Sequence, residues 1–136
     1  MEAKSILIVE DEAVSALDLS KILNNLGYHV TGIVASGEKA IEAVDNQVPD
    51  LILMDIHLAG KLSGIEAAAE ILQKHTLPII YVTAYSEPEL VREAKLTRPY
   101  GFIIKPFTER GLQTAIEIAL YKAELDREYQ REHAQL

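Results

Sequence analysis

The sequence predicts an α/β fold: one doubly wound parallel sheet built from five strand–helix units, with an extended helix at its C-terminal end. Short apolar segments alternate with amphipathic segments along the 136 residues. Apolar segments such as Ser5–Val9 and Leu51–Met54 are uninterrupted, which is typical of strands covered by helices on both faces. With 49% hydrophobic residues, the chain can bury one sizeable core. No internal repeat or second domain is visible.

The expected strands and helices alternate strictly along the chain. We expect strands at 5–9, 29–35, 51–54, 78–82 and 101–104. The spacing of apolar residues predicts helices over 14–26, from 36 to about 44, over 65–72, from the segment 86–89 to just before 99, and from 109 onward. Gly27 is suited to end the first helix, and Ser36 and Thr108 to cap later ones. Ser86 has capping-box spacing to Glu89, and Pro88 suits the first turn of that helix.

The last helix is expected to be longer than the sheet requires. From Thr108 to Leu136 there is no proline, and the only glycine, Gly111, lies in the first turn. Apolar residues at helical spacing end at Ala123, and charged residues dominate afterwards. We expect a domain over residues 1–123 and a helical extension over 124–136, which is either a solvated tail or a linker or dimer-forming helix. Three heptads of clean spacing are absent, so a coiled coil is not predicted.

Composition disfavours several classes of function. The formal net charge of −8 argues against binding to nucleic acid or to an anionic membrane surface. The chain has no cysteine, so it can form no disulfide, thiolate metal site or thiol nucleophile. No apolar run approaches the length of a membrane span, and no signal-peptide segment follows the start. We therefore expect a cytoplasmic protein.

Polar side chains follow four of the expected strands, at the sheet edge where open α/β folds bind ligands. They are Glu10, Asp11 and Glu12 after the first strand, Asp55 after the third, Thr83 after the fourth and Lys105 after the fifth. Carboxylates this close stay ionised only around a cation, and an all-oxygen site favours Mg²⁺ (or Mn²⁺). A carboxylate can attack phosphorus, and a metal ion, an ammonium and a hydroxyl can then neutralise the transferred group. Asp11, Lys105 and Thr83 fit these three needs.

Four motifs at these strand ends resemble those of receiver (response-regulator) domains in two-component, histidine-kinase signalling. They are Val9-Glu10-Asp11-Glu12, Leu53-Met54-Asp55-Ile56, Val82-Thr83-Ala84 and Lys105-Pro106-Phe107. The resemblance covers about residues 4–123. It implies a flavodoxin-like fold with strand order 2-1-3-4-5.

The resemblance also implies roles for the acidic residues. Asp55 would be the phosphoacceptor and a metal ligand. Asp11 would bind Mg²⁺ directly, Glu10 would act through water, and the backbone carbonyl of His57 would complete the protein ligands. Many members have Asp where this chain has Glu10, and the loop from Asp55 to Gly64 looks one residue longer than the commonest form.

The remaining implied roles concern the phosphoryl group and the switch. Thr83 would hydrogen-bond a phosphoryl oxygen and Lys105 would pair with it, while the peptide bond from Lys105 to Pro106 would be cis. Phe102 stands at the position of the family's switch aromatic, which turns inward when Thr83 moves. His57 and Tyr85 sit where members of the family tune hydrolysis, and we hypothesise that their bulk hinders the attacking water.

The implied function is a phosphorylation-activated signalling switch rather than an enzyme, catalysing only its own phosphorylation and dephosphorylation. Its partners would be a sensor histidine kinase or phosphotransfer protein and a downstream effector protein or fused domain. Dimerisation is left open. One alternative is a pseudo-receiver that binds partners without phosphorylation. An aspartate-nucleophile phosphatase is disfavoured because His57 stands where haloacid-dehalogenase-type enzymes have a second Asp. A nucleotide- or flavin-binding module is disfavoured because the acidic segment 10–13 repels phosphate.

Overall fold

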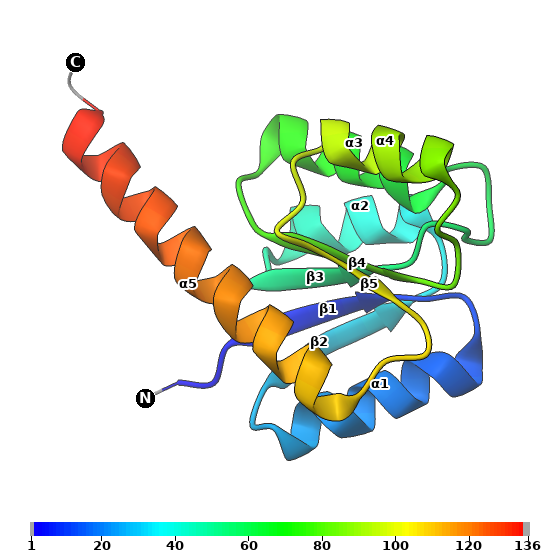
Figure 1. The fold of residues 1–136 in the computed structure, drawn as a ribbon. Coiled ribbons are helices and arrows are strands. Elements are labelled where there is room, and N and C mark those ends of the chain that lie inside the picture. The colour runs from blue at the N-terminus through cyan, green and yellow to red at the C-terminus, as the bar shows by residue number, and fades with distance from the viewer. Residues whose placement is uncertain (1, 135–136) are drawn as a thin grey trace.

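The computed structural model describes residues 2–134 and confirms the five strand–helix units (Figure 1). All strand pairs are parallel, in the order β2-β1-β3-β4-β5. The strands are β1 (Ser5–Val9), β2 (His29–Val34), β3 (Leu51–Met54), β4 (Ile79–Thr83) and β5 (Gly101–Ile104). The helices are α1 (Ala13–Asn25), α2 (Gly37–Asn46), α3 (Gly64–Lys74), α4 (Pro88–Leu96) and α5 (Glu109–His133).

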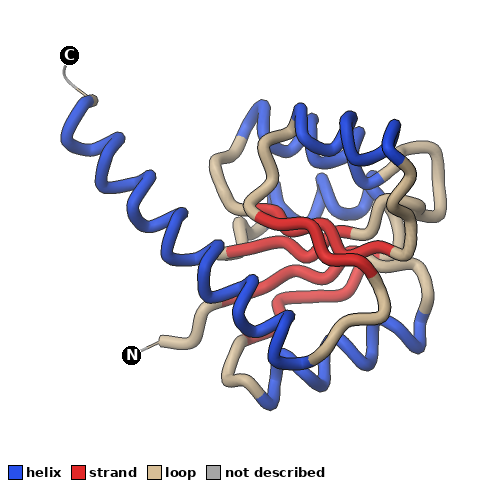
Figure 2. Tube along the Cα trace, viewed as in Figure 1, coloured by secondary structure: helices blue, strands red, loops and turns tan. Residues whose placement is uncertain are grey.

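Helices cover both faces of the sheet (Figure 2). Alternate side chains of a strand point to opposite faces, so β1 contributes to two separate cores. Ile6 and Ile8 pack with α1 and α5, whereas Leu7 and Val9 pack with α2, α3 and α4. The order of the strands places α1 and α5 together on one face and the other three helices on the opposite face.

Local sequence signals explain several helix ends. The Ser36 hydroxyl accepts the N–H of Lys39 at the start of α2, and the Thr108 hydroxyl accepts the N–H of Gly111 at the start of α5. Both predicted caps are therefore confirmed. Gly27 follows α1 with a φ of 92°, a conformation that suits glycine.

The predicted cap of α4 is wrong. The helix begins at Pro88, and its N-cap residue, Glu87, makes no side-chain capping bond. The prediction of Pro88 in the first turn is confirmed, because proline fits the first helical position, where an N–H has no partner. A capping box that the sequence analysis missed starts α3, where Ser63 and Glu66 each bond the other's backbone N–H.

The helix α5 is continuous over 25 residues and runs past the edge of the sheet (Figure 1). The helical part of the expected extension thus reaches His133, and residues 135 and 136 of that expectation lie outside the described residues. Between residues 2 and 134, no helix combines the length and apolar character needed to cross a bilayer.

Candidate functional site

The site forms where the carboxyl ends of β1, β3, β4 and β5 meet. Strand pairing brings the distant segments together: the N–H of Asp55 donates to the carbonyl of Val9 (2.9 Å), and the N–H of Lys105 donates to the carbonyl of Thr83 (2.9 Å). The order of the strands reverses direction between β1 and β3, which is the place where α/β sheets bind ligands.

At the centre of the site, Lys105 bridges two buried carboxylates. Its Nζ donates to Oε1 of Glu10 and to Oδ2 of Asp55, the second at 3.2 Å. Glu10 and Asp55 are only 4% and 7% exposed. Their other oxygens are also bonded, because Oδ1 of Asp55 accepts the N–H of Ile56 (2.7 Å) and Oε2 of Glu10 accepts the N–H of Glu12 (3.1 Å). Both carboxylates are thereby fixed in orientation.

The surroundings raise the pKa values of both Glu10 and Lys105. Burial raises the pKa of the Glu10 carboxyl, and the nearby charge of Asp55 adds to the effect, while bonds from Lys105 and from the N–H of Glu12 only partly offset it. Desolvation alone would lower the pKa of Lys105, but its bonds and charge interactions with Glu10 and Asp55 outweigh that and raise it. One ammonium therefore stays charged between two carboxylates that it does not fully neutralise.

A cavity of about 560 Å³ opens beside this cluster. Its wall carries four carboxylates and one ammonium, in the set Glu10, Asp11, Glu12, Ser15, Asp55, His57, Leu58, Ala84, Tyr85 and Lys105. Such an excess of oxygen donors suits a hard divalent cation. Over residues 2–134, no three His, Asp or Glu side chains are grouped to hold a metal ion by themselves. A cation here would need backbone carbonyl and water ligands as well, which is the habit of Mg²⁺.

Two aromatic side chains meet at this cavity. The rings of His57, from the loop after β3, and Tyr85, from the loop after β4, have centroids 3.8 Å apart and are tilted by 52°. Both residues line the cavity. The sequence analysis singled them out for their bulk, and the structure brings them into direct contact.

Thr83 and Phe102 do not line the cavity. Thr83 is fully buried, and its hydroxyl accepts the N–H of Tyr85 at 3.3 Å. Phe102 is half-buried on the face covered by α2, α3 and α4, with its ring centroid 5.9 Å from that of Tyr81. The peptide bond from Lys105 to Pro106 is cis, as the resemblance implied.

Gly64 is a residue at the site that the sequence analysis did not single out. It is the first residue of α3, and its N–H donates to the carbonyl of Ile56 (2.7 Å). A Cβ at this position would lie 1.9 Å from the carbonyl oxygen of Asp55. The missed capping box was the available signal, because a cap at Ser63 places Gly64 in the first turn, against the strand end.

Comparisons with known proteins agree with this geometry. The profile of the response regulator receiver domain matches residues 6–117. The transcriptional regulatory protein PdtaR of Mycobacterium tuberculosis is 37% identical over 117 residues, which are 86% of this chain and 57% of that protein. The receiver domain of a modulated diguanylate cyclase from Desulfovibrio desulfuricans superposes with a TM-score of 0.87 at 37% identity, covering 92% of this chain and 99% of that one.

A second similar structure carries a metal ion. It is the receiver domain of the sensor histidine kinase PA1611 from Pseudomonas aeruginosa, with magnesium coordinated in its active-site cleft. It has a TM-score of 0.79 at 31% identity and covers 87% of this chain and 98% of that one. The present chain thus spans little more than half of PdtaR but nearly the whole of these two solved domains.

Proposed function

The chain belongs to the response regulator receiver domain family, and from that premise we propose that it is a phosphorylation-dependent switch whose acceptor is Asp55. Receiver domains are regulators of signalling rather than classical enzymes. The observation that carries the proposal is the state of the Asp55 side chain. It is buried at the edge of an acidic cavity, with one oxygen on the N–H of Ile56 and the other on Lys105.

The donor set fits a bound Mg²⁺ (or Mn²⁺). Asp11 and Asp55 would be its side-chain ligands, with the backbone carbonyl of His57, and Glu10 would act through water. The carbonyl and water ligands are needed, because no group of side chains within residues 2–134 could hold a metal ion by itself. The ion would neutralise oxygens of the entering phosphoryl group. The magnesium in the similar cleft of PA1611 supports the assignment.

The reaction would be in-line transfer from a phosphohistidine of a sensor kinase or phosphotransfer protein. A carboxylate oxygen of Asp55 forms the new P–O bond as the P–N bond breaks, and the electron pair of that bond returns to the imidazole. Lys105 can stabilise the negative charge of the transferred phosphoryl group, because its ammonium already contacts the Asp55 carboxylate that becomes the acyl phosphate. No general base is required, since a carboxylate nucleophile has no proton to lose.

The response would start at Thr83. Its hydroxyl would leave the N–H of Tyr85 and bond a phosphoryl oxygen, and Phe102 would turn inward beside Tyr81. Phosphorylation would then favour one of two conformations of the domain. The surface that contacts an effector protein or a fused output domain would change as a result. The chain covers 57% of PdtaR, so both kinds of output fit the proposal.

The test is phosphorylation by acetyl phosphate, followed by intact mass. We expect one phosphoryl adduct that requires Mg²⁺ and is lost in Asp55→Asn. Asp50→Asn is the matched control, because Asp50 lies at the opposite edge of the sheet, where it bonds Ser5. An adduct that persists in Asp55→Asn would refute the acceptor. No adduct from either acetyl phosphate or a panel of histidine kinases, with Mg²⁺ still bound, would favour a phosphorylation-independent binding module.

A further inference from the structure

The loop between β3 and α3 carries the backbone carbonyl of His57 into the acidic cavity. Its outer part, residues 59–61, is exposed to solvent. A backbone carbonyl cannot be aimed by rotating a side chain, so the position of this oxygen depends on the course of the loop. Mg²⁺ demands nearly ideal octahedral geometry from its ligands. Contacts that fix the loop therefore bear on metal binding.

The carboxylate of Glu38, in the first turn of α2, binds this loop. Its Oε2 accepts the N–H of Lys61 at 3.0 Å. The bond from Lys61 is the main reason that the pKa of the Glu38 carboxyl lies below its usual value. The ionised form of Glu38 is therefore the form that holds the loop.

The loop is shaped to receive this carboxylate. Gly60 has a φ of 89°, in the left-handed region that favours glycine. A Cβ at Gly60 would lie 2.9 Å from Oε1 and 3.0 Å from Oε2 of Glu38, so the absence of a side chain lets the backbone lie against the carboxylate. Beside it, Ala59 pairs with Ser36, the N-cap residue of α2, in an isolated parallel bridge. Two residues at the start of α2 thus hold three successive residues of the loop.

The start of α2 is itself held firmly by the domain. Ala40 and Val44, further along the helix, are fully buried in the core. A Cβ at Gly37 would lie 2.9 Å from that of Ala67 on α3 and 3.0 Å from that of Leu62 in the loop. Because the helix packs this closely, Glu38 projects from a fixed base.

We propose that Glu38 is a positioning residue of the metal site, whose carboxylate fixes the loop that presents the carbonyl of His57 to Mg²⁺. This role rests on the proposed function, in which His57 supplies that ligand. Glu38 lies outside the cavity wall, so it acts through the loop and not on the ion. Without its bond, the loop would present the carbonyl in only a fraction of the molecules, and the apparent affinity for Mg²⁺ would fall by that fraction.

A Mg²⁺ titration followed by the NMR shifts of backbone amides tests this role without a phosphoryl group. Glu38→Ala should weaken Mg²⁺ binding by about fivefold to tenfold, because partners that orient a metal ligand contribute on this order. Glu38→Gln keeps one oxygen that can accept the N–H of Lys61, so it should recover most of the affinity. In the metal-free protein, the amide of Lys61 should exchange with solvent faster in Glu38→Ala than in the wild type.

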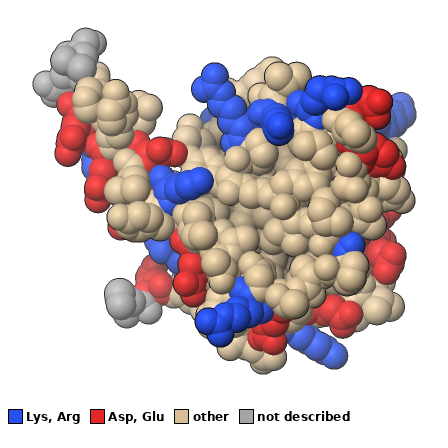
Figure 3. All heavy atoms as spheres, in the orientation of Figure 1, with Lys and Arg blue, Asp and Glu red and all other residues tan. Residues whose placement is uncertain are grey.

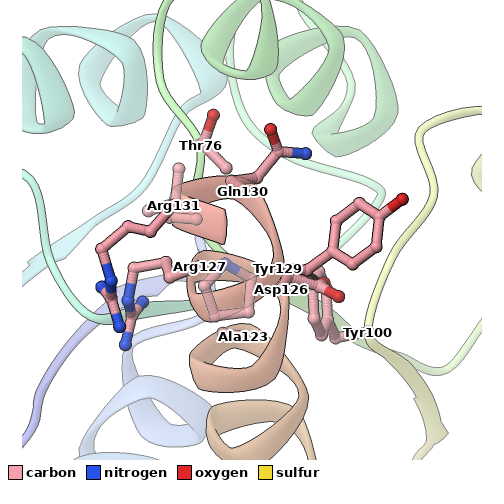
Figure 4. Close-up of a pocket in the computed structure, with 10 residues that line it drawn as sticks. Thr76, Tyr100, Ala123, Asp126, Arg127, Tyr129, Gln130 and Arg131 are labelled. Atoms are coloured by element: carbon pink, nitrogen blue, oxygen red, sulfur yellow. Dashed lines mark hydrogen bonds between the residues drawn. The ribbon is translucent and has the colours of Figure 1, made fainter. Parts of the chain in front are cut away.

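Two control variants separate the loop contact from charge and from the general loss of a hydrogen bond. Glu42→Ala removes the same charge from an exposed position one turn further along α2. Figure 3 shows acidic side chains spread over the face in view, so one carboxylate is a small part of the field that attracts cations. Tyr100→Phe removes a hydrogen bond to Asp126 at the groove of about 500 Å³ between α5 and the segment before β4 (Figure 4). Both variants should bind Mg²⁺ as the wild type does.

The outcomes distinguish this role from the proposed function. Unchanged affinity in Glu38→Ala, with Mg²⁺ bound by the wild type, would refute the role of Glu38 alone. An equal loss in Glu38→Gln or in either control variant would assign the effect to charge or to general stability, and would also refute it. A wild-type protein that binds no Mg²⁺ would refute the metal site of the proposed function and, with it, this role.

Discussion

The close contact between the start of α3 and Asp55, the residue that follows β3, gives a sharp test of how the site is built. Replacing Gly64 with alanine adds a Cβ that would lie 1.9 Å from the carbonyl oxygen of Asp55, and 3.0 Å from Cα of Ile56. Neither neighbour is the end of a flexible side chain, because both atoms belong to the backbone. The backbone of either the helix start or the strand end must therefore move by about 1 Å.

The expected cost follows from three contributions. Overpacking of a close contact costs roughly 1–3 kcal/mol. The bond from the N–H of Gly64 to the carbonyl of Ile56 (2.7 Å) is weakened by the same movement, for about 1 kcal/mol. Alanine returns up to about 1 kcal/mol through its better helix propensity. We expect the free energy of unfolding of Gly64→Ala to fall by about 2–3 kcal/mol, which lowers Tm by on the order of 10 °C.

Two assays check the reasoning together. Urea unfolding should show the loss of stability, and intact mass after acetyl phosphate should show phosphorylation slowed on the order of 100-fold, because the attacking carboxylate is displaced. Gly32→Ala is the matched control, since its Cβ would meet only Cδ1 of Leu7, at an ordinary 3.8 Å. Wild-type stability and phosphorylation in Gly64→Ala would refute the claim that this glycine fixes the position of Asp55.

Three further variants probe the surroundings of the site. Tyr85→Ala removes one of the two aromatic side chains in contact at the cavity, and we expect the phosphorylated state to decay several-fold faster in a time course of intact mass; an unchanged lifetime would refute the shielding role. Lys105→Met leaves two buried carboxylates without their cation, and urea unfolding at neutral pH should show a loss of about 2 kcal/mol. Because burial holds the pKa of Glu10 above its usual value, a protonated Glu10 is tolerated in the fold, and this loss should shrink as the pH falls through that raised pKa. Tyr81→Phe removes the hydrogen bond to Thr97 (2.7 Å) and should cost about 1 kcal/mol in thermal unfolding, without preventing phosphorylation.

The fold was predictable because the spacing of apolar residues in the sequence matches the pattern of buried residues in the structure. Continuous apolar segments mark the central strands, and hydroxyl caps mark two helix starts. Pro88 lies in the first turn of α4 as expected, but the N-cap is Glu87 and not Ser86, so the predicted capping box does not form. The strand expected at 78–82 is observed one residue later, as Ile79–Thr83, and the Thr83 side chain at its end is fully buried.

The composition of the site was predictable, but its geometry was not. Parallel pairing requires residues at the ends of strands to gather at one edge, so the meeting of Glu10, Asp55 and Lys105 follows from topology alone. The bonding of Lys105 to both carboxylates depends on distances that are set only when β5 packs beside β4. The contact between His57 and Tyr85 joins two loops, and periodicity carries no information on how loops approach each other.

The hydrogen bonds of β4 indicate which end of α4 would respond to phosphorylation of Asp55. The hydroxyl of Thr97 donates to the carbonyl of Ala94 (2.6 Å), so Tyr81 must donate to Thr97. This pair ties the middle of β4 to the C-terminal end of α4.

The hydroxyl of Thr83, two residues further along β4, accepts the N–H of Tyr85 in the loop before α4. That helix begins without a side-chain cap. A rotation of the Thr83 hydroxyl would therefore free the loop and the uncapped N-terminal turn of α4, while the anchored C-terminal end stays in place. Because α2 and α3 begin with side-chain caps and α4 does not, we expect the N-terminal turn of α4 to be the part of this face that opens most easily if Asp55 is phosphorylated.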